Sequence, residues 1–514
     1  MNASISAFGL LAASLVLGSW THSLRADEPP RAFVEQDLGA LPEGVRFRAF
    51  SRDGRHAGGV VSRDGKECVF VDGRLGPGFH MVGAKSPVFS PDGKHVAYYT
   101  LKEGDVYTLV VDDKEGPECE GINSILFSPD GRLAYEVRKG GKWSVVMDGK
   151  QGPAYDGVRL RSSAFSPPDG KHFVYVARKG EDWHVIVDGR EGPRYHEIAW
   201  DEVRFSADGG RMAYVADKDH RWVVVVDGQE QQPYRQIGGE HWRLPVFSAD
   251  GRHLAYQAGN GGKSLIVVDG RPGPEYDEIG EECPIISADG SRVAYRAKKG
   301  DQWVAVIDGR ESPAYDYVHQ NTLTFSADGL HVAYVAWRDD HRITVVDGRE
   351  GPAYGRLLGK SSLVFSPDGK HVACQATKGE KGDEELVVLD GKEGATYWQV
   401  TPGTVVFSPD SKRMAYVALK AWETPAVVVV DGKEGKPFDG IRAVPPVFSV
   451  DSRHFAYVAR QNNRELVVVD GLASGQYDTV FVEELVFQPD GTLTFIATRD
   501  NALYRVSFAP VPKP

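Results

Sequence analysis

The chain has 514 residues but few of the motifs that hold metals or cofactors. Its four cysteines are Cys68, Cys119, Cys283 and Cys374, and no two form a C-x-x-C pair, so a zinc site or a redox dithiol has no support. A D-x-[DN]-x-[DN]-G calcium loop, a G-x-x-x-x-G-K phosphate loop and a G-x-S-x-G nucleophile elbow are also missing. The motifs therefore predict no metal and no cofactor.

Basic residues are fewer than acidic residues. Lys and Arg total 60 against 72 Asp and Glu, which gives a net charge of −12, and the two signs are interspersed along the chain. Nucleic-acid binding needs a clustered basic surface that neutralises phosphates. A nucleic-acid partner is therefore not expected.

Long apolar runs are missing after the N-terminus. The first 21 residues carry no charged side chain, and the apolar part, Phe8 to Trp20, has the length of a signal peptide and is short for a membrane span. Residues 1–26, ending at the small Ala26, are predicted to be a signal peptide, although the n-region lacks Lys and Arg. An uncleaved anchor is the alternative. We expect an exported protein, periplasmic or secreted, with no membrane span after removal of the signal.

What the sequence has in abundance is one repeated phrase. "VFSPDGKHVA" stands at 88–97 and again, unchanged, at 364–373. Internal repeats of this length are typical of solenoids and propellers. Altered copies place an aspartate every 38–42 residues, which predicts twelve repeats: Asp53, Asp92, Asp130, Asp169, Asp208, Asp250, Asp289, Asp328, Asp368, Asp410, Asp451 and Asp490.

Each repeat reads as a four-stranded meander. In residues 158–200, "RLRSSAFS" is extended, "PPDGKH" is a turn, "FVYVA" is a strand and "RKGED" is a hairpin loop. "WHVIVDG" is a third strand that ends in a second Asp-Gly turn, and "REGPRYHEIAW" brings in a fourth strand. Cys119 and Cys374 stand where sister repeats have Tyr or Phe, and we interpret both as core substitutions.

The third strands indicate how the meanders pack. "VVVV" before Asp227 and "AVVVV" before Asp431 are apolar on both faces, as in sheets that are covered on both sides. Blades of a propeller are covered in this way, and the period near 40 fits one blade. Strands of the type "FSPDGKHVAYVA" followed by "VVVDG" resemble the WD-repeat-like propeller repeat of TolB and of the prolyl-oligopeptidase propellers. The resemblance covers nearly the whole chain and implies a fold rather than a function.

The predicted fold class is therefore all-β, a propeller of twelve four-stranded blades. Because rings usually hold four to eight blades, two six-bladed rings are expected, in residues 44–282 and 283–514. The last repeat stops before its fourth strand. Within an N-terminal segment, 27–43, residues 31–38 could supply that strand, and a single twelve-bladed ring could close in the same way.

Recurring polar and aromatic residues are interpreted as parts of the repeat. Seven histidines follow a turn aspartate by three, and we expect them to flank turns rather than form a metal site. Each aspartate precedes Gly or Ser in a turn, and turn formation accounts for it. Tryptophans that begin four of the third strands are interpreted as packing between blades: Trp143, Trp183, Trp222 and Trp303.

Function is expected where the repeats disagree. In a meander the first and third turns lie on one face of the ring and hardly vary, whereas the second loops and the connectors between blades lie on the opposite face and differ. The alternative is that these are ordinary solvated loops. From this face we select eight candidate residues for binding a ligand or partner: His220, Arg221, His241, Trp242, Trp337, Arg338, His341 and Trp422.

Three functional hypotheses follow. The leading one is a non-catalytic, exported scaffold that binds a protein or a cell-envelope glycan. The second is an enzyme with its site in a propeller channel, such as a polysaccharide lyase or glycosidase, although the sequence designates no catalytic residue. The third is a structural spacer. Neither the ligand nor the oligomeric state can be read from the sequence.

Overall fold

A computed structural model describes residues 33–509, with gaps at 43, 52–55, 85–86, 162–163, 200–202, 239–243, 283, 358–362, 379–383 and 423–424. The predicted signal peptide lies outside these residues. The described part folds into 56 strands and contains no α-helix. No described helix is therefore available that could cross a membrane.

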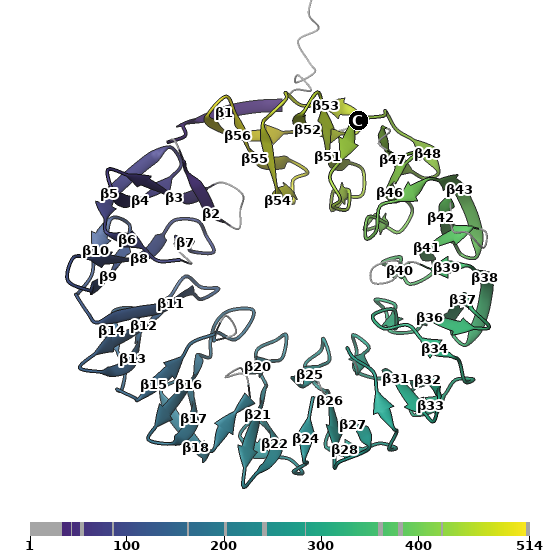
Figure 1. Cartoon of the computed structure of the whole chain (residues 1–514), viewed down its shortest axis with the longest axis horizontal. Helices are drawn as coiled ribbons and strands as arrows, with labels where there is room; N and C mark the ends of the chain where they lie inside the picture. Colours follow the sequence, from purple (N-terminus) through teal and green to yellow (C-terminus); the bar gives the residue numbers. More distant parts are fainter. Residues whose placement is uncertain are drawn as a thin grey trace, which may run out of the picture.

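The strands form twelve antiparallel sheets, one per predicted repeat, which follow one another around a ring (Figure 1). The structure thereby confirms the propeller fold that the repeat resemblance implied, with twelve blades. The innermost strand of each blade is short, and in eight blades it is split in two. In chain order these strands are β2 (Arg46–Phe50), β6 (Met81–Val82) with β7 (Val88–Phe89), β11 (Gly121–Phe127), β15 (Gly157–Arg159), β19 (Glu197–Ile198) with β20 (Arg204–Phe205), β24 (Gln236–Ile237) with β25 (Val246–Phe247), β29 (Glu278–Ile279) with β30 (Ile285–Ile286), β34 (Tyr317–Val318) with β35 (Thr324–Phe325), β39 (Arg356–Leu357) with β40 (Leu363–Phe365), β44 (Gln399–Val400) with β45 (Val406–Phe407), β49 (Gly440–Ile441) with β50 (Val447–Phe448), and β54 (Thr479–Phe487).

The second and third strands make the long central hairpin of each blade. The second strands are β3 (Ala57–Arg63), β8 (Val96–Lys102), β12 (Leu133–Lys139), β16 (Val174–Lys179), β21 (Met212–Lys218), β26 (Leu254–Gly259), β31 (Val293–Lys299), β36 (Val332–Arg338), β41 (Val372–Lys378), β46 (Met414–Leu419), β51 (Phe455–Gln461) and β55 (Leu493–Arg499). The third strands are β4 (Lys66–Val71), β9 (Val106–Val111), β13 (Lys142–Met147), β17 (Asp182–Val187), β22 (Arg221–Val226), β27 (Ser264–Val268), β32 (Gln302–Ile307), β37 (His341–Val346), β42 (Glu384–Leu389), β47 (Ala426–Val430), β52 (Arg464–Val469) and β56 (Ala502–Phe508).

The outer strands run along the rim of the ring (Figure 1). Blades 1 to 11 take them from the end of their own repeat, whereas the last blade takes its outer strand from the N-terminal segment. They are β5 (Arg74–Phe79), β10 (Lys114–Glu115), β14 (Lys150–Gln151), β18 (Arg190–Tyr195), β23 (Gln229–Glu230), β28 (Arg271–Pro272), β33 (Arg310–Glu311), β38 (Arg349–Tyr354), β43 (Lys392–Tyr397), β48 (Lys433–Glu434), β53 (Leu472–Ala473) and, for blade 12, β1 (Phe33–Ala40).

The expected division into two six-bladed rings is wrong, because all twelve blades share one ring (Figure 1). The described residues of 44–282 and of 283–514 form two halves of that ring. At the supposed cut, Ala255 and Ile266 of blade 6 pack against Tyr295 and Val304 of blade 7 in one buried cluster. Twelve such clusters occupy the twelve interfaces between blades. A break near residue 282 would expose two apolar faces to water. The hydrophobic effect that holds the other blades together therefore also holds blades 6 and 7 together.

The ring closes within blade 12. β1 pairs antiparallel with β56, from Phe33 opposite Phe508 to Ala40 opposite Ala502. The N-terminal segment thus supplies the fourth strand that the last repeat lacks. On the far side of this blade, Ile496 and Leu503 are buried against Phe70 of blade 1, which completes the circle.

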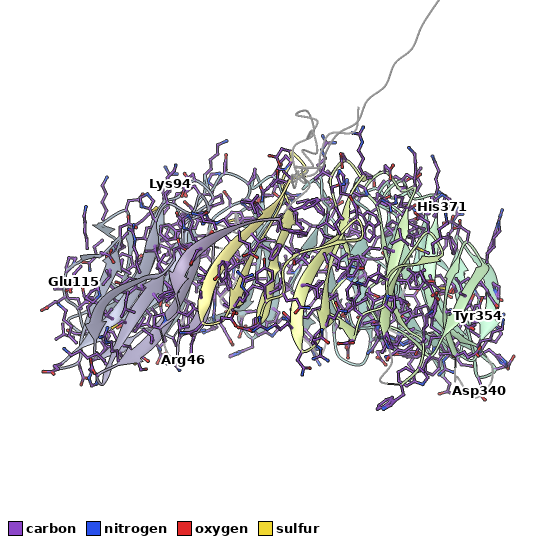
Figure 2. All side chains as sticks on the ribbon, turned by 90° about the horizontal axis from the view of Figure 1, so that it is seen from above. Arg46, Lys94, Glu115, Asp340, Tyr354 and His371 are labelled. Carbon is purple, nitrogen blue, oxygen red and sulfur yellow. The ribbon has the colours of Figure 1, made fainter. Side chains whose placement is uncertain are left out.

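The ring has two chemically different faces (Figure 2). Lys94 and His371, which follow first turns, lie at one face, and Asp340, in a second loop, lies at the other together with Arg46. We call these the turn face, made of the first and third turns, and the loop face, made of the second loops and the connectors between blades. The third turns are uniform because Asp and Gly both adopt positive φ, as in Asp347 at 50° and Gly348 at 76°, which is the geometry of a type I′ hairpin turn.

Candidate functional site

The recurring histidines of the turn face are held by aspartates. In seven blades the His Nδ1 lies 2.5–2.8 Å from an Asp Oδ2 of the third turn, as in His331 and Asp347 at 2.6 Å. Arg211, Arg292 and Arg413 make the same contact in three other blades. Each of these histidines serves its own blade, and within the described residues no group of three His, Cys, Asp or Glu is arranged to hold a metal ion.

A repeated contact also organises the loop face. In five blades an aspartate directly after the outer aromatic residue accepts a hydrogen bond from a backbone N–H of the second loop, at 2.7–3.0 Å. These pairs are Asp156 with Gly180, Asp277 with Gly300, Asp316 with Asp339, Asp439 with Asn462, and Asp478 with Asp500. In blade 3, Glu120 takes this role and accepts from Gly140 and Gly141, and these N–H groups lower the pKa of its carboxyl. The carboxylate ties the connector to the loop and fixes both.

Blade 10 replaces this carboxylate with tryptophan. Trp398 follows the outer residue Tyr397, and its ring meets the ring of Trp422, from the second loop, at 5.2 Å in an edge-to-face arrangement of 82°. Trp422 is 70% exposed and Trp398 is 37% exposed. Two large apolar rings thus stand in solvent where six other blades carry a loop-fixing acid, and burial of such rings is what anchors partner surfaces.

Blade 5 departs at the same position. His196 replaces the acid and stacks on His220 of the second loop, with ring centroids 5.6 Å apart and planes 3° from parallel. The neighbouring Arg221 begins β22 and is exposed. His220 and Arg221 are therefore on the loop face as predicted, with His220 engaged in a contact inside the blade.

In blade 8, two of the predicted residues, Trp337 and Arg338, pack against neighbouring side chains, and the third, His341, is exposed. Trp337 lies against Tyr317 at 5.2 Å, and the Arg342 guanidinium covers its ring at 4.1 Å. Arg338 donates to Glu350 at 2.7 Å and covers the ring of Tyr315 at 4.9 Å. His341 contacts the Asp339 carbonyl through Nδ1 at 2.7 Å.

The structure thus places the predicted residues in three different blades and gathers no single site from them. His241 and Trp242 lie outside the described residues. Trp422 has the exposure expected of a binding residue, and its companion Trp398 was not predicted. A comparison of the residue after each outer aromatic would have revealed Trp398, because that place holds aspartate in five sister blades.

Comparisons with known proteins add nothing on function. No protein-family model matches the sequence, and no curated protein matches it. Among solved structures, a eukaryotic initiation factor shares 12% identity over 74% of this chain and 99% of its own, with a TM-score of 0.36. The Dos1 propeller shares 10% identity over 59% and 90%, with a TM-score of 0.29. TolB from Acinetobacter baumannii shares 13% identity over 60% and 79%, with a TM-score of 0.23.

Proposed function

We propose that the protein is a non-catalytic binding scaffold, exported to the cell envelope, that holds a protein or an envelope glycan on its loop face. The edge-to-face pair of Trp398 and Trp422 carries the proposal. A rigid ring that repeats one blade twelve times keeps its loops in fixed positions, and binding residues concentrate on such loops.

The location of the pair supports this role. Trp398 lies next to β44, where Gln399 pairs with Leu419 at the end of β46, so its ring adjoins a paired strand. A partner that covers Trp422 gains the burial of a large aromatic side chain. This combination is typical of residues that dominate binding energy in interfaces.

The test is recovery of partners from envelope extract by the purified protein, in parallel with a glycan panel. Trp422→Ala and Trp398→Ala should each reduce binding at least tenfold. Leu330→Ala is the matched control, because Leu330 is a large apolar residue with 69% exposure on the turn face. Recovery of a protein or of a glycan would assign the partner class. Unchanged binding by both tryptophan variants would refute this site, and turnover of a polysaccharide without stable binding would favour the enzyme hypothesis instead.

Export is tested separately. Expression of the full chain should give protein in the periplasm or medium, with a mature N-terminus close to residue 27. Retention of the intact chain in the cytoplasm would refute the cell-envelope role and leave the loop-face site to be tested on its own.

A further inference from the structure

Two blades lack a ring that the other ten carry on the second strand. It is a tyrosine in nine blades and Phe495 in blade 12, whereas Gly59 stands at this place in blade 1 and Cys374 in blade 9. Eight interfaces pair this ring with the outer aromatic of the preceding blade, edge to face, at centroid distances of 5.9–6.4 Å. Between blades 8 and 9 the outer aromatic, Tyr354, has only the small Cys374 opposite it.

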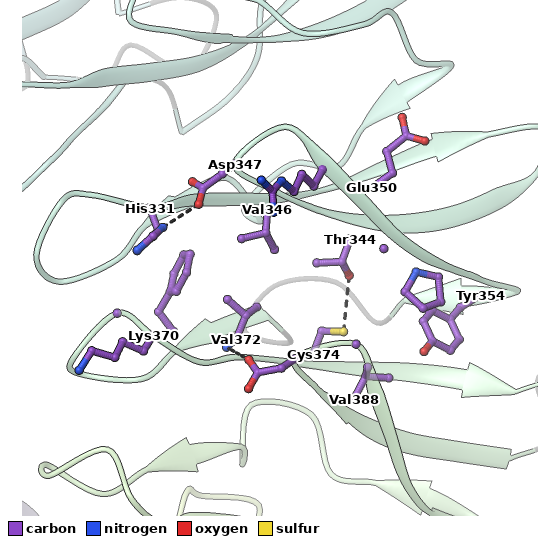
Figure 3. Close-up of a pocket in the computed structure, with 17 residues that line it drawn as sticks. His331, Thr344, Val346, Asp347, Glu350, Tyr354, Lys370, Val372, Cys374 and Val388 are labelled. Atoms are coloured by element: carbon purple, nitrogen blue, oxygen red, sulfur yellow. Dashed lines mark hydrogen bonds and ion pairs between the residues drawn. The ribbon is translucent and has the colours of Figure 1, made fainter.

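A cavity of 410 Å³ occupies this interface (Figure 3). Its lining includes Val346 and Tyr354 of blade 8 and Val372, Cys374 and Val388 of blade 9. The groove between blades 9 and 10 has the ring of Tyr416 in its lining, and Tyr397, the counterpart of Tyr354, is not part of that lining. Between blades 10 and 11 the groove has both Tyr457 and the outer Phe438 in its lining, so an outer aromatic can line a groove with the opposite ring present. What distinguishes the interface of blades 8 and 9 is that Cys374 stands in the place of that ring, beside Tyr354.

Two residues with hydroxyl groups, Thr344 and Tyr354, line the cavity. Thr344, where ten of the other blades have an aliphatic residue and blade 12 has Arg505, donates to the Sγ of Cys374 at 3.5 Å. Tyr354 is 6% exposed, and its hydroxyl has no hydrogen-bond partner. Tyr354 lines the cavity close to Val388 (Figure 3), and its hydroxyl oxygen is buried in the cavity wall. A buried hydroxyl without a partner costs stability, and a ligand that pairs with it recovers that cost.

The cysteine acts as part of the wall. Burial raises the pKa of the Cys374 thiol to about 11, so at neutral pH it is a neutral, weakly polar group rather than a nucleophile. The accessible lining of the cavity is mainly apolar, and six ionisable residues also contribute to it: His331, Asp347, Arg349, Glu350, Lys370 and Asp390.

We propose that the pocket between blades 8 and 9 binds a small para-substituted phenol, whose ring takes the place of the tyrosine ring that Cys374 replaces and whose hydroxyl pairs with that of Tyr354. Other interfaces show the ring arrangement, since Tyr195 and Tyr214 meet edge to face with centroids 6.0 Å apart. Apolar cavities of about 150 Å³ already bind benzene-sized molecules, so the volume is sufficient. This site is at a different interface from the tryptophan pair and does not depend on the proposed function.

The probe is p-cresol, with toluene as the ligand that lacks the hydroxyl. Saturation-transfer NMR and thermal shift on the full protein should show that p-cresol binds and that toluene binds about tenfold more weakly, the size expected for one hydrogen bond. Cys374→Tyr should abolish p-cresol binding, and Cys374→Ala should retain it.

Tyr354→Phe keeps the shape of the pocket and should remove the preference for p-cresol over toluene, which tests the site even where Cys374→Tyr fails to fold. Two results would overturn the proposal. One is the lack of p-cresol binding to the wild-type protein at millimolar concentration. The other is equal binding to a folded Cys374→Tyr variant, which would place the bound ligand elsewhere.

Discussion

Glu35 of the N-terminal strand and Arg499 of the last second strand form a two-fold hydrogen-bonded ion pair. The Arg499 Nη1 donates to Oε1 at 3.0 Å and Nη2 donates to Oε2 at 2.7 Å. The hydroxyl of Tyr477 in blade 11 donates to the same Oε1 at 2.6 Å. Residues 442 and 464 positions apart thus meet on one carboxylate, where the ring closes.

The same clasp recurs inside the ring. Tyr315 donates to Glu350 of the next blade at 3.0 Å, and Arg338 donates to the other oxygen at 2.7 Å. Two further blades make the corresponding contacts with lysine, through Glu230 and Glu311. Glu35 therefore supplies from the beginning of the chain what each of these glutamates supplies from within its own repeat.

Glu35→Gln should destabilise the closed ring by about 1–3 kcal/mol, because it removes a charged acceptor and weakens three hydrogen bonds. Thermal denaturation measures the loss. Glu350→Gln is the matched control, since Glu350 makes the same contacts at an internal interface. The two losses should be similar, but hydrogen exchange should accelerate in β1 only in Glu35→Gln. Equal protection of β1 in both variants would show that this clasp does not hold the closure.

Acid should weaken the closure through Glu35. The Arg499 guanidinium holds the pKa of the Glu35 carboxyl below its usual range, against a smaller opposing effect of burial. Because the pKa is lower in the folded protein, the stabilisation is present above the unfolded value of about 4.3 and is lost as the pH falls through the folded value. The difference in melting temperature between wild type and Glu35→Gln should be constant near neutrality and shrink below pH 4. A difference that grows in acid would have the wrong sign for this pair.

The blades could be predicted from the sequence because their determinants are local. Asp-Gly turns with positive φ and apolar third strands repeat in the letters themselves, as at Asp347 and at Val427–Val430. The number of rings could not be predicted. The number of blades in a ring depends on the angle between neighbouring blades, which is set by how side chains such as Ile266 and Tyr295 fill each interface. The ring closes when these angles add up to a full turn, and no single repeat determines their sum.

The candidate site was predicted only in part, for a similar reason. Trp422 is visible as an irregular residue in a loop of unusual length. Trp337 and Arg338 look like loop residues in "WRDDHR", but β36 continues through both, and each is only partly exposed and in contact with neighbouring side chains. The residues around Trp398 in the sequence are typical of the repeat. Its role is recognised only by aligning it with the carboxylates that bind the second loops of other blades.

Those carboxylate ties should control loop motion more than overall stability. Asp277→Ala removes the acceptor for the Gly300 N–H, a bond of 2.8 Å at the exposed loop face. The global unfolding free energy should fall by no more than about 1 kcal/mol, whereas hydrogen exchange in the second loop of blade 7 should accelerate. The loop of blade 8 is the internal control, because Asp316 still binds Asp339 there. Unchanged exchange at Gly300 would contradict the role assigned to these acids.

Tyr416→Cys should reproduce, between blades 9 and 10, the gap that exists naturally between blades 8 and 9. Tyr416 is buried and meets Tyr397 edge to face at 6.1 Å, so loss of its ring removes packing on both blades. Large-to-small core substitutions of this kind cost roughly 2–4 kcal/mol, with the cost set by the cavity that remains. The melting temperature should fall accordingly, and p-cresol should restore part of the loss by filling the new space. Tyr416→Phe, which keeps the ring, should change stability by less than about 1 kcal/mol. A Tyr416→Cys variant as stable as the wild type would mean that neighbouring side chains collapse into the gap, and that the cavity beside Cys374 has another cause than the missing ring.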